Sequence, residues 1–230
     1  MAAGTMERMT MSDGAEINVY HVHPSGERRG GLVLIHEIFG VTDHIRELCD
    51  EYAGYGYEVL APALFDREYP GFEADYTGED FQRAVQLARE LHPFELSLKD
   101  AQTCIDALVG ADGSGGPVFM VGYCYGGSVC WFGATRLKGL AAASGYYGSL
   151  IPGAADEEPR IPVILHFGRH DHGIPMEGVE KVIAKDWPNA TVYVYEAGHG
   201  FNSDRRKDYH EPSADLALER TLELFRANGG

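Results

Sequence analysis

Short apolar runs alternate along the chain with longer stretches in which apolar residues recur at helical spacing. A continuous apolar run such as residues 31–35 is typical of a strand that is buried on both faces of a sheet. The predicted strands cover residues 15–22, 31–35, 57–61, 117–121, 140–144, 162–167 and 191–195. The predicted helices cover residues 43–55, 79–91, 96–109, 127–137, 176–185 and 213–226.

Strands that are separated by helices predict βαβ units, and therefore a mostly parallel sheet with helices on both faces. We expect an α/β fold with a twisted sheet of about seven or eight strands. Polar residues alternate with apolar ones in the strand at 15–22, which favours an edge position. Residues 62–78 predict a long loop over one face, and the glycines of 110–116 predict a turn. Since no linker composition interrupts the pattern, we expect one domain over residues 1–230.

The composition is that of a globular protein, with 44% hydrophobic and 23% charged residues among 230. This excludes a disordered chain, a collagen-like chain and a coiled coil. Nineteen basic and 35 acidic residues give a formal net charge of −16. Such a charge repels phosphate backbones and anionic membranes, so we expect no nucleic-acid partner and no membrane partner.

The sequence shows neither a recognisable targeting signal nor a cysteine spacing typical of disulfide pairs. No apolar run approaches the roughly 20 residues of a membrane-spanning helix, and the first 20 residues do not resemble a secretory signal. The four cysteines show no CxxC spacing. We therefore expect reduced thiols and a cytoplasmic location.

The most specific motif is Gly122-Tyr-Cys-Tyr-Gly-Gly127, which follows a predicted buried strand and precedes a predicted helix. It has the form of a nucleophile elbow, G-x-nucleophile-x-G, with Cys124 in the central position. Glycines are needed in so sharp a turn because a side chain there would collide with the neighbouring strand or helix. The following N–H group, that of Tyr125, can stabilise an oxyanion, and the helix N-terminus favours thiolate over thiol.

An acid and a histidine follow two later strands. The strand at 162–167 leads to Asp171, and the strand at 191–195 leads to His199. In hydrolases of this fold the chain order is nucleophile, acid, histidine, each just beyond a strand. The order Cys124, Asp171, His199 matches, and all three are expected at the carboxyl edge of the sheet, where a histidine can serve as base and a carboxylate can orient it.

The motifs together resemble the dienelactone hydrolase (carboxymethylenebutenolidase-like) family of the α/β-hydrolase superfamily, over about residues 15 to 227. The matching segments are Ile35–Gly40 (IHEIFG), Gly122–Gly127 (GYCYGG), Tyr146–Gly148 (YYG), Gly168–Asp171 (GRHD) and Gly198–Phe201 (GHGF). The combination of an H-E-x-x-G turn with a cysteine elbow is more specific than either motif alone.

The resemblance implies a role for each matched residue of the site. Cys124 would be the nucleophile, His199 the base and Asp171 its orienting acid. Glu37 would lie near the thiol and take its proton when substrate enters. The two N–H groups of the oxyanion hole would come from Ile38 and Tyr125; Ile38 also lies in the loop where the fold requires the second donor. Tyr123 and one of Tyr146 or Tyr147 would line the site. The residues expected to bind substrate are Phe39, Arg83, Tyr123, Tyr146, Tyr147 and Phe201.

The basic residues after the histidine depart from the family pattern. Members that act on dienelactone clamp its carboxylate with arginines, one of them four positions after the catalytic histidine. Here Arg205, Arg206 and Lys207 follow His199 at six to eight positions. Arg83, on the helix after the long loop, is expected to serve as a second clamp. The loop at 62–78 and the helix at 79–91 are expected to cap the site, and their aromatic residues to set its specificity.

The predicted function is hydrolysis of a small-molecule lactone or small carboxylic ester through a cysteine nucleophile, by a monomer or homodimer without a cofactor. His166, His170 and His172 lie near Asp171, but structural zinc needs four ligands, and we expect no metal there. The alternative is a non-enzymatic thiol redox sensor or a binding protein on the hydrolase fold, because an accessible thiolate is also sensitive to oxidation.

Overall fold

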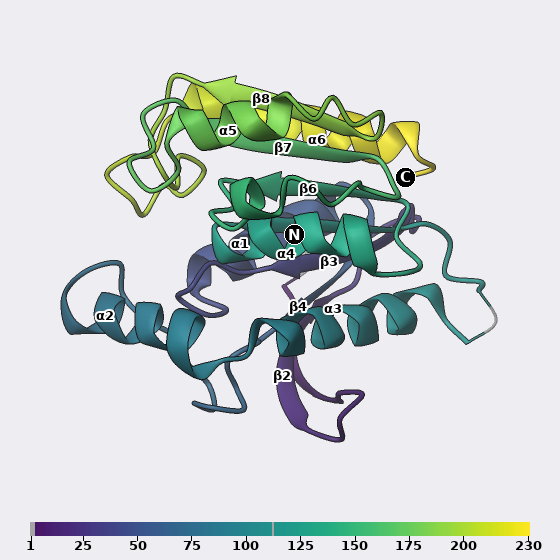
Figure 1. The fold of residues 1–230 in the computed structure, drawn as a ribbon. Coiled ribbons are helices and arrows are strands. Elements are labelled where there is room, and N and C mark those ends of the chain that lie inside the picture. Colours follow the sequence, from purple (N-terminus) through teal and green to yellow (C-terminus); the bar gives the residue numbers. More distant parts are fainter. Residues whose placement is uncertain (1–2, 112) are drawn as a thin grey trace.

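The strands form a single sheet in the computed structural model, which describes residues 3–111 and 113–230 (Figure 1). The order is β1-β2-β4-β3-β5-β6-β7-β8; β1, β2 and β4 pair antiparallel, and all other pairs are parallel. The strands are β1 (Thr5–Thr10), β2 (Glu16–Val22), β3 (Gly30–Ile35), β4 (Tyr57–Pro62), β5 (Val118–Tyr123), β6 (Ala142–Tyr146), β7 (Val163–Gly168) and β8 (Ala190–Tyr195).

Helices cover both faces of this sheet, as predicted. On β5, Phe119 stacks on Phe225 of α6 and the Tyr123 hydroxyl approaches that of Tyr52 on α1, whereas Met120 meets Gly133 of α4 on the opposite face. The helices are α1 (Asp43–Gly54), α2 (Gly78–Gln86), α3 (Phe94–Val109), α4 (Tyr125–Arg136), α5 (Met176–Ile183) and α6 (Glu211–Ala227), with short turns η1 (Leu87–Leu91) and η2 (Ile151–Ala154). The predicted α/β fold in one domain is confirmed.

Strand β1 was not predicted, and its presence corrects the expected edge position of β2. The side chains of β1 are almost all exposed, so the strand has no apolar run that could indicate it. It is held instead by its complete antiparallel register with β2, from Thr5 opposite His21 to Thr10 opposite Glu16. Residues 1, 2 and 112 lie outside the described residues, and residue 112 belongs to the predicted turn at 110–116. That one domain covers all of residues 1–230 therefore stays a prediction.

The helix predicted at 79–91 is two different elements. The α-helix α2 ends at Gln86, and the chain continues as the π-helical turn η1. Only Ala84 of α2 is buried, and Figure 1 shows α2 standing apart from the main layers. As predicted, residues 63–77 before it form no helix or strand beyond one bridge, between Gly40 and Glu73.

Among the described residues, no helix is both long and apolar enough to span a membrane.

Candidate active site

Cys124 lies in the turn between the end of β5 and the start of α4, with backbone angles φ 55° and ψ −108°. This is the left-handed region, which costs a residue with a side chain about 1–3 kcal/mol. The backbone N–H group of Cys124 donates a hydrogen bond to the carbonyl of Tyr146 at 3.0 Å, which holds the turn against β6. A β-carbon on Gly122 would overlap the Gly126 carbonyl, and one on Gly126 would overlap the Ile35 carbonyl. Both glycines are therefore required for the approach of α4 to the sheet.

A chain of hydrogen bonds joins Cys124, His199 and Asp171 across the carboxyl edge of the sheet. The Cys124 sulfur lies 3.2 Å from Nε2 of His199, and Nδ1 of His199 lies 2.6 Å from Oδ2 of Asp171. The other oxygen of Asp171 accepts backbone N–H groups of Gly173 and Ile174 at 2.7 and 3.1 Å. The carboxylate is therefore fixed, and it holds the imidazole ring in one orientation.

The charge on His199 follows from these neighbours. Burial by itself lowers the pKa of His199, but the negative charge of the Cys124 sulfur and the hydrogen bond to Asp171 outweigh it. They raise the pKa from the ordinary 6.5 to about 10. At neutral pH the imidazole therefore carries a proton, and its Nε2 lies within hydrogen-bond distance of the Cys124 sulfur.

Glu37 and Arg206 form a second pair at the carboxyl edge of the sheet. Glu37 follows β3 and is buried, and its Oε1 accepts a hydrogen bond from Nη1 of Arg206 at 3.1 Å. The guanidinium also lies 5.9 Å from the ring centres of Phe39 and Tyr76. Glu37 was expected near the thiol of Cys124. It is paired instead with Arg206, which the sequence had not placed in the site. The only signal for Arg206 was the basic triplet after His199.

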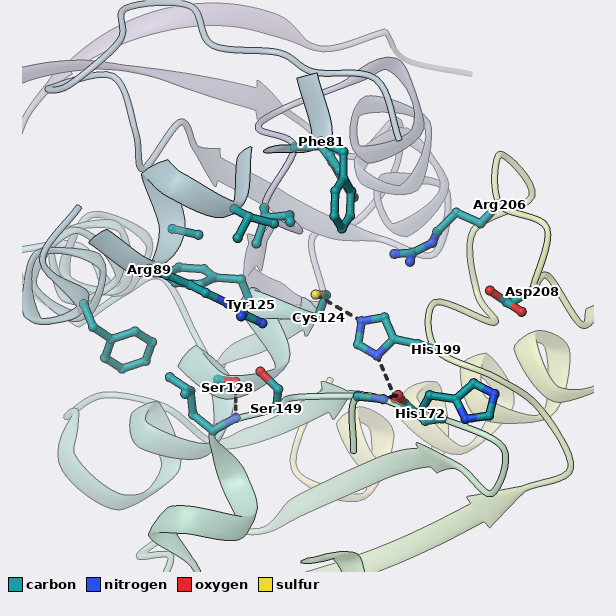
Figure 2. A pocket seen from close by; sticks show the side chains of 18 of the residues that line it. Phe81, Arg89, Cys124, Tyr125, Ser128, Ser149, His172, His199, Arg206 and Asp208 are labelled. Atoms are coloured by element: carbon teal, nitrogen blue, oxygen red, sulfur yellow. Dashed lines mark hydrogen bonds and ion pairs between the residues drawn. The ribbon is translucent and has the colours of Figure 1, made fainter. Parts of the chain in front are cut away.

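A cavity of about 1150 Å³ opens in front of Cys124, and Figure 2 shows Phe81, Arg89 and Arg206 around it. Six expected residues line it: Ile38, Phe39, Cys124, Tyr125, Asp171 and His199. The segment 79–91, which was expected to cap the site, contributes Phe81, Val85, Ala88, Arg89 and Leu91 to the lining, and Phe94 at the start of α3 adds to them. Apolar side chains that are spaced along a surface helix look like a core-facing stripe in the sequence, and only the structure shows that they face a cavity.

The four aromatic residues Tyr123, Tyr146, Tyr147 and Phe201 do not line the cavity, contrary to the expectation that they would bind substrate. All four are fully buried. The Tyr146 hydroxyl bonds Thr221 at 2.9 Å, in the core between β6 and α6. Tyr147 packs behind His199, with 5.1 Å between ring centres, and Phe201 packs on Tyr147. These side chains support the site from behind.

The expected substrate clamp Arg83 is also absent from the cavity lining, because its guanidinium turns outward to lie 5.7 Å from the ring centre of Tyr69.

The side chains of His166 and His170, both near Asp171 in the sequence, point to different partners. His166 is buried, with Nδ1 bonded to the Tyr195 hydroxyl at 2.8 Å, whereas His170 pairs with Glu196 at the surface.

The sheet topology and the placement of this site at its carboxyl edge define an α/β hydrolase. The chain belongs to the dienelactone hydrolase family, whose model matches residues 17–229. It is a hydrolase of the esterase type.

Curated relatives and solved structures agree with this assignment. The Escherichia coli K12 protein named "Putative carboxymethylenebutenolidase" is 31% identical over 95% of this chain and 85% of its own length. Carboxymethylenebutenolidase 1 of Cupriavidus pinatubonensis is 29% identical, with 94% of each chain covered. The crystal structure of a "Putative Dienelactone Hydrolase" from Klebsiella pneumoniae superposes with a TM-score of 0.83 at 28% identity, over 97% of this chain and 99% of that one.

Proposed function

We propose that the protein hydrolyses lactones or carboxylic esters with Cys124 as nucleophile. The observation that carries the proposal is the hydrogen-bonded chain from the Cys124 sulfur through His199 to Asp171, opening into a cavity. The thiolate attacks the carbonyl carbon, and the oxyanion that forms is bound by the N–H groups of Ile38 and Tyr125. The N–H of Tyr125 has no partner within its helix, because Tyr125 is the first residue of α4.

Protons are moved by His199. Its imidazolium donates a proton to the leaving alkoxide as the C–O bond breaks, which leaves an acyl thioester on Cys124. The neutral imidazole then takes a proton from water, whose oxygen attacks the thioester and releases the carboxylic acid. Asp171 keeps Nδ1 protonated, so that Nε2 alone faces the sulfur and the substrate.

Arg206 is the group best placed to bind a carboxylate on the substrate. It lines the cavity, and Glu37 is its carboxylate partner within the described residues. A substrate carboxylate that draws Arg206 away would free Glu37 to take the thiol proton, the role that the family resemblance implies. We therefore propose that Arg206 does what was expected of Arg83.

Replacing Arg206 with glutamine tests this directly. We expect KM for a carboxylate-bearing lactone to rise by at least tenfold, because a charge-assisted hydrogen bond contributes about 1.5–3 kcal/mol. KM for a neutral p-nitrophenyl ester should change by less than twofold. Arg83→Gln is the matched control and should leave both values unchanged. Equal effects of Arg206→Gln on both substrates would contradict the assignment.

Exposed apolar side chains in the lining of the cavity indicate a substrate with a large apolar group. Phe81, Leu91 and Leu150 line the cavity and are exposed although they are large and hydrophobic. Exposed apolar side chains that gather around a cavity indicate a binding surface. We propose that the acyl or alcohol group of the substrate lies against them.

A series of p-nitrophenyl esters from acetate to decanoate measures this apolar contact. We expect kcat/KM to rise with acyl length, because each buried CH₂ contributes about 0.8 kcal/mol. Leu91→Ser should flatten the rise, whereas the control Leu216→Ser, an exposed leucine on α6, should not. A series that is flat in the wild type would contradict the apolar contact while leaving the cysteine mechanism intact.

The redox-sensor alternative gains no support from the other cysteines. Cys49, Cys104 and Cys130 are buried, and burial raises the pKa of each thiol. Such thiols attack a sulfenic acid slowly. Oxidation by peroxide that changed assembly or binding, in a protein without ester turnover, would favour the sensor instead.

A further inference from the structure

Imidazole and carboxylate side chains meet at the opposite end of the sheet from Cys124. His21 lies near the end of β2, His23 follows that strand, and Glu58 is the second residue of the neighbouring strand β4. Glu58 therefore lies where the parallel strands begin, whereas Cys124 follows the end of β5. This group has no part in the hydrolase chemistry described above.

The three side chains present their ligand atoms to one point. Oε1 of Glu58 lies 2.9 Å from Nε2 of His21 and 3.4 Å from Nδ1 of His23. All three atoms lie within 4.8 Å of one another. Ligand atoms around a tetrahedral zinc ion, at bond lengths of about 2.0–2.1 Å, are separated by roughly 3.3 Å. Small side-chain movements would thus place all three at bonding distance from one ion.

Two further side chains orient this group. Oε2 of Glu7, on β1, lies 3.2 Å from Nδ1 of His21 and can accept the Nδ1 proton, so that an ion which displaces the Nε2 proton would bind the Nε2 lone pair. Nε of Arg28 donates to Oε2 of Glu58 at 2.6 Å, so Oε1 remains the oxygen that faces the histidines. A carboxylate behind a ligating imidazole is the usual outer partner in metal sites.

We propose that His21, His23 and Glu58 bind a divalent transition-metal ion of the zinc class, with water completing the coordination. Imidazole nitrogen with one carboxylate suits zinc, copper and nickel, whereas magnesium prefers an all-oxygen set. Glu7 and Glu58 supply two negative charges against the one positive charge of Arg28, so the site remains attractive to a cation. The ion would join β1, β2 and β4, the antiparallel edge of the sheet.

Isothermal titration with ZnCl₂ tests the proposal, with Cys124→Ala protein measured beside the wild type so that metal bound by the thiolate is recognised. We expect one zinc per chain at this site in both proteins. His23→Ala should weaken binding at least tenfold, and Glu7→Gln should weaken it about 10–100-fold, the usual effect of losing an outer partner. MgCl₂ should give no heat of binding.

His170→Ala is the matched control, because His170 is similarly exposed (63% against 71% for His23) and also faces a glutamate, Glu196, at 3.0 Å. It should leave the zinc affinity unchanged. Hydrolysis measured without added metal should be the same in His23→Ala and wild type, which shows that the variant is folded. Unchanged zinc affinity in His23→Ala, or no binding to the wild type, would overturn the proposal.

Discussion

At the scale of single residues, the site depends on which atom holds a proton. His199 keeps its proton to a pKa of about 10 because the Cys124 sulfur and the Asp171 carboxylate lie on either side of its ring. The protonated ring can therefore serve as a proton donor at Nε2, the nitrogen that faces the sulfur. Glu37, for which the resemblance implied a contact with the thiol, is held by Arg206 instead.

Substituting Asp171 with asparagine should move the pH dependence of hydrolysis in a defined direction. The carboxylate raises the pKa of His199, so its removal lowers that pKa and the alkaline loss of activity begins at lower pH. We also expect kcat to fall by about 10²–10⁴-fold, the usual contribution of general acid–base catalysis. The measurement is kcat/KM from pH 6 to 10.5. An alkaline limb at the same pH in both proteins would contradict this role of Asp171.

At the scale of elements, the sequence was informative wherever burial dictates residue type. Strand β5 and its elbow could be predicted because an apolar run leads into glycines that no other residue can replace. Strand β1 and the π-helical turn η1 could not. The first is held by backbone pairing between exposed side chains, and the second differs from an α-helix only in hydrogen bonding. The helix at 79–91 was expected over the site, but which of its side chains line the cavity could not be predicted, since apolar spacing does not distinguish a core from a cavity.

Adding a methyl group at the elbow should show how tightly α4 is packed. In Gly126→Ala the new carbon would overlap the Ile35 carbonyl, so the turn or β3 must shift. We expect a loss of stability of about 1–3 kcal/mol, as in overpacked cores, together with a fall in kcat. The control is Gly54→Ala, where the added carbon meets nothing within 4 Å. Unfolding in urea measures both, and equal stability of the two variants would contradict the packing described here.

At the scale of the whole molecule, the chain order of the motifs was enough to predict the fold. It also predicted that Cys124, Asp171 and His199 lie together at the carboxyl edge of the sheet. The same reasoning failed for Arg206, which reaches the cavity from a loop whose path depends on tertiary contacts, and for Arg83, whose helix turns it outward. Tyr123 and Tyr146 adjoin site motifs in the sequence, yet the alternation of strand side chains directs both into the core.

Buried histidines should make the whole protein sensitive to acid. Burial lowers the pKa of His36 to about 4 and that of His166 to about 3, against an ordinary value of 6.5. As pH falls below 6.5, these two histidines are therefore protonated in the unfolded chain but remain neutral in the folded protein. Stability is lost from there toward pH 3–4, by up to about 1.4 kcal/mol per pH unit for each histidine.

The slope of this acid destabilisation can be assigned to a residue. His166→Gln should reduce the loss of unfolding free energy between pH 6.5 and 4.5, measured in urea, whereas substitution of the exposed His172 by glutamine should not. The reduction is expected because glutamine has no proton to gain. If the slope in His166→Gln equals that of the wild type, His166 is not a source of the acid sensitivity.

The central claim, that Cys124 is the nucleophile of a hydrolase, is tested most directly by steady-state hydrolysis of dienelactone and p-nitrophenyl acetate with wild type and Cys124→Ala. We predict turnover in the wild type and a loss of at least about 10³-fold in the variant, with its circular dichroism unchanged. Retained turnover in a folded Cys124→Ala protein would contradict the claim.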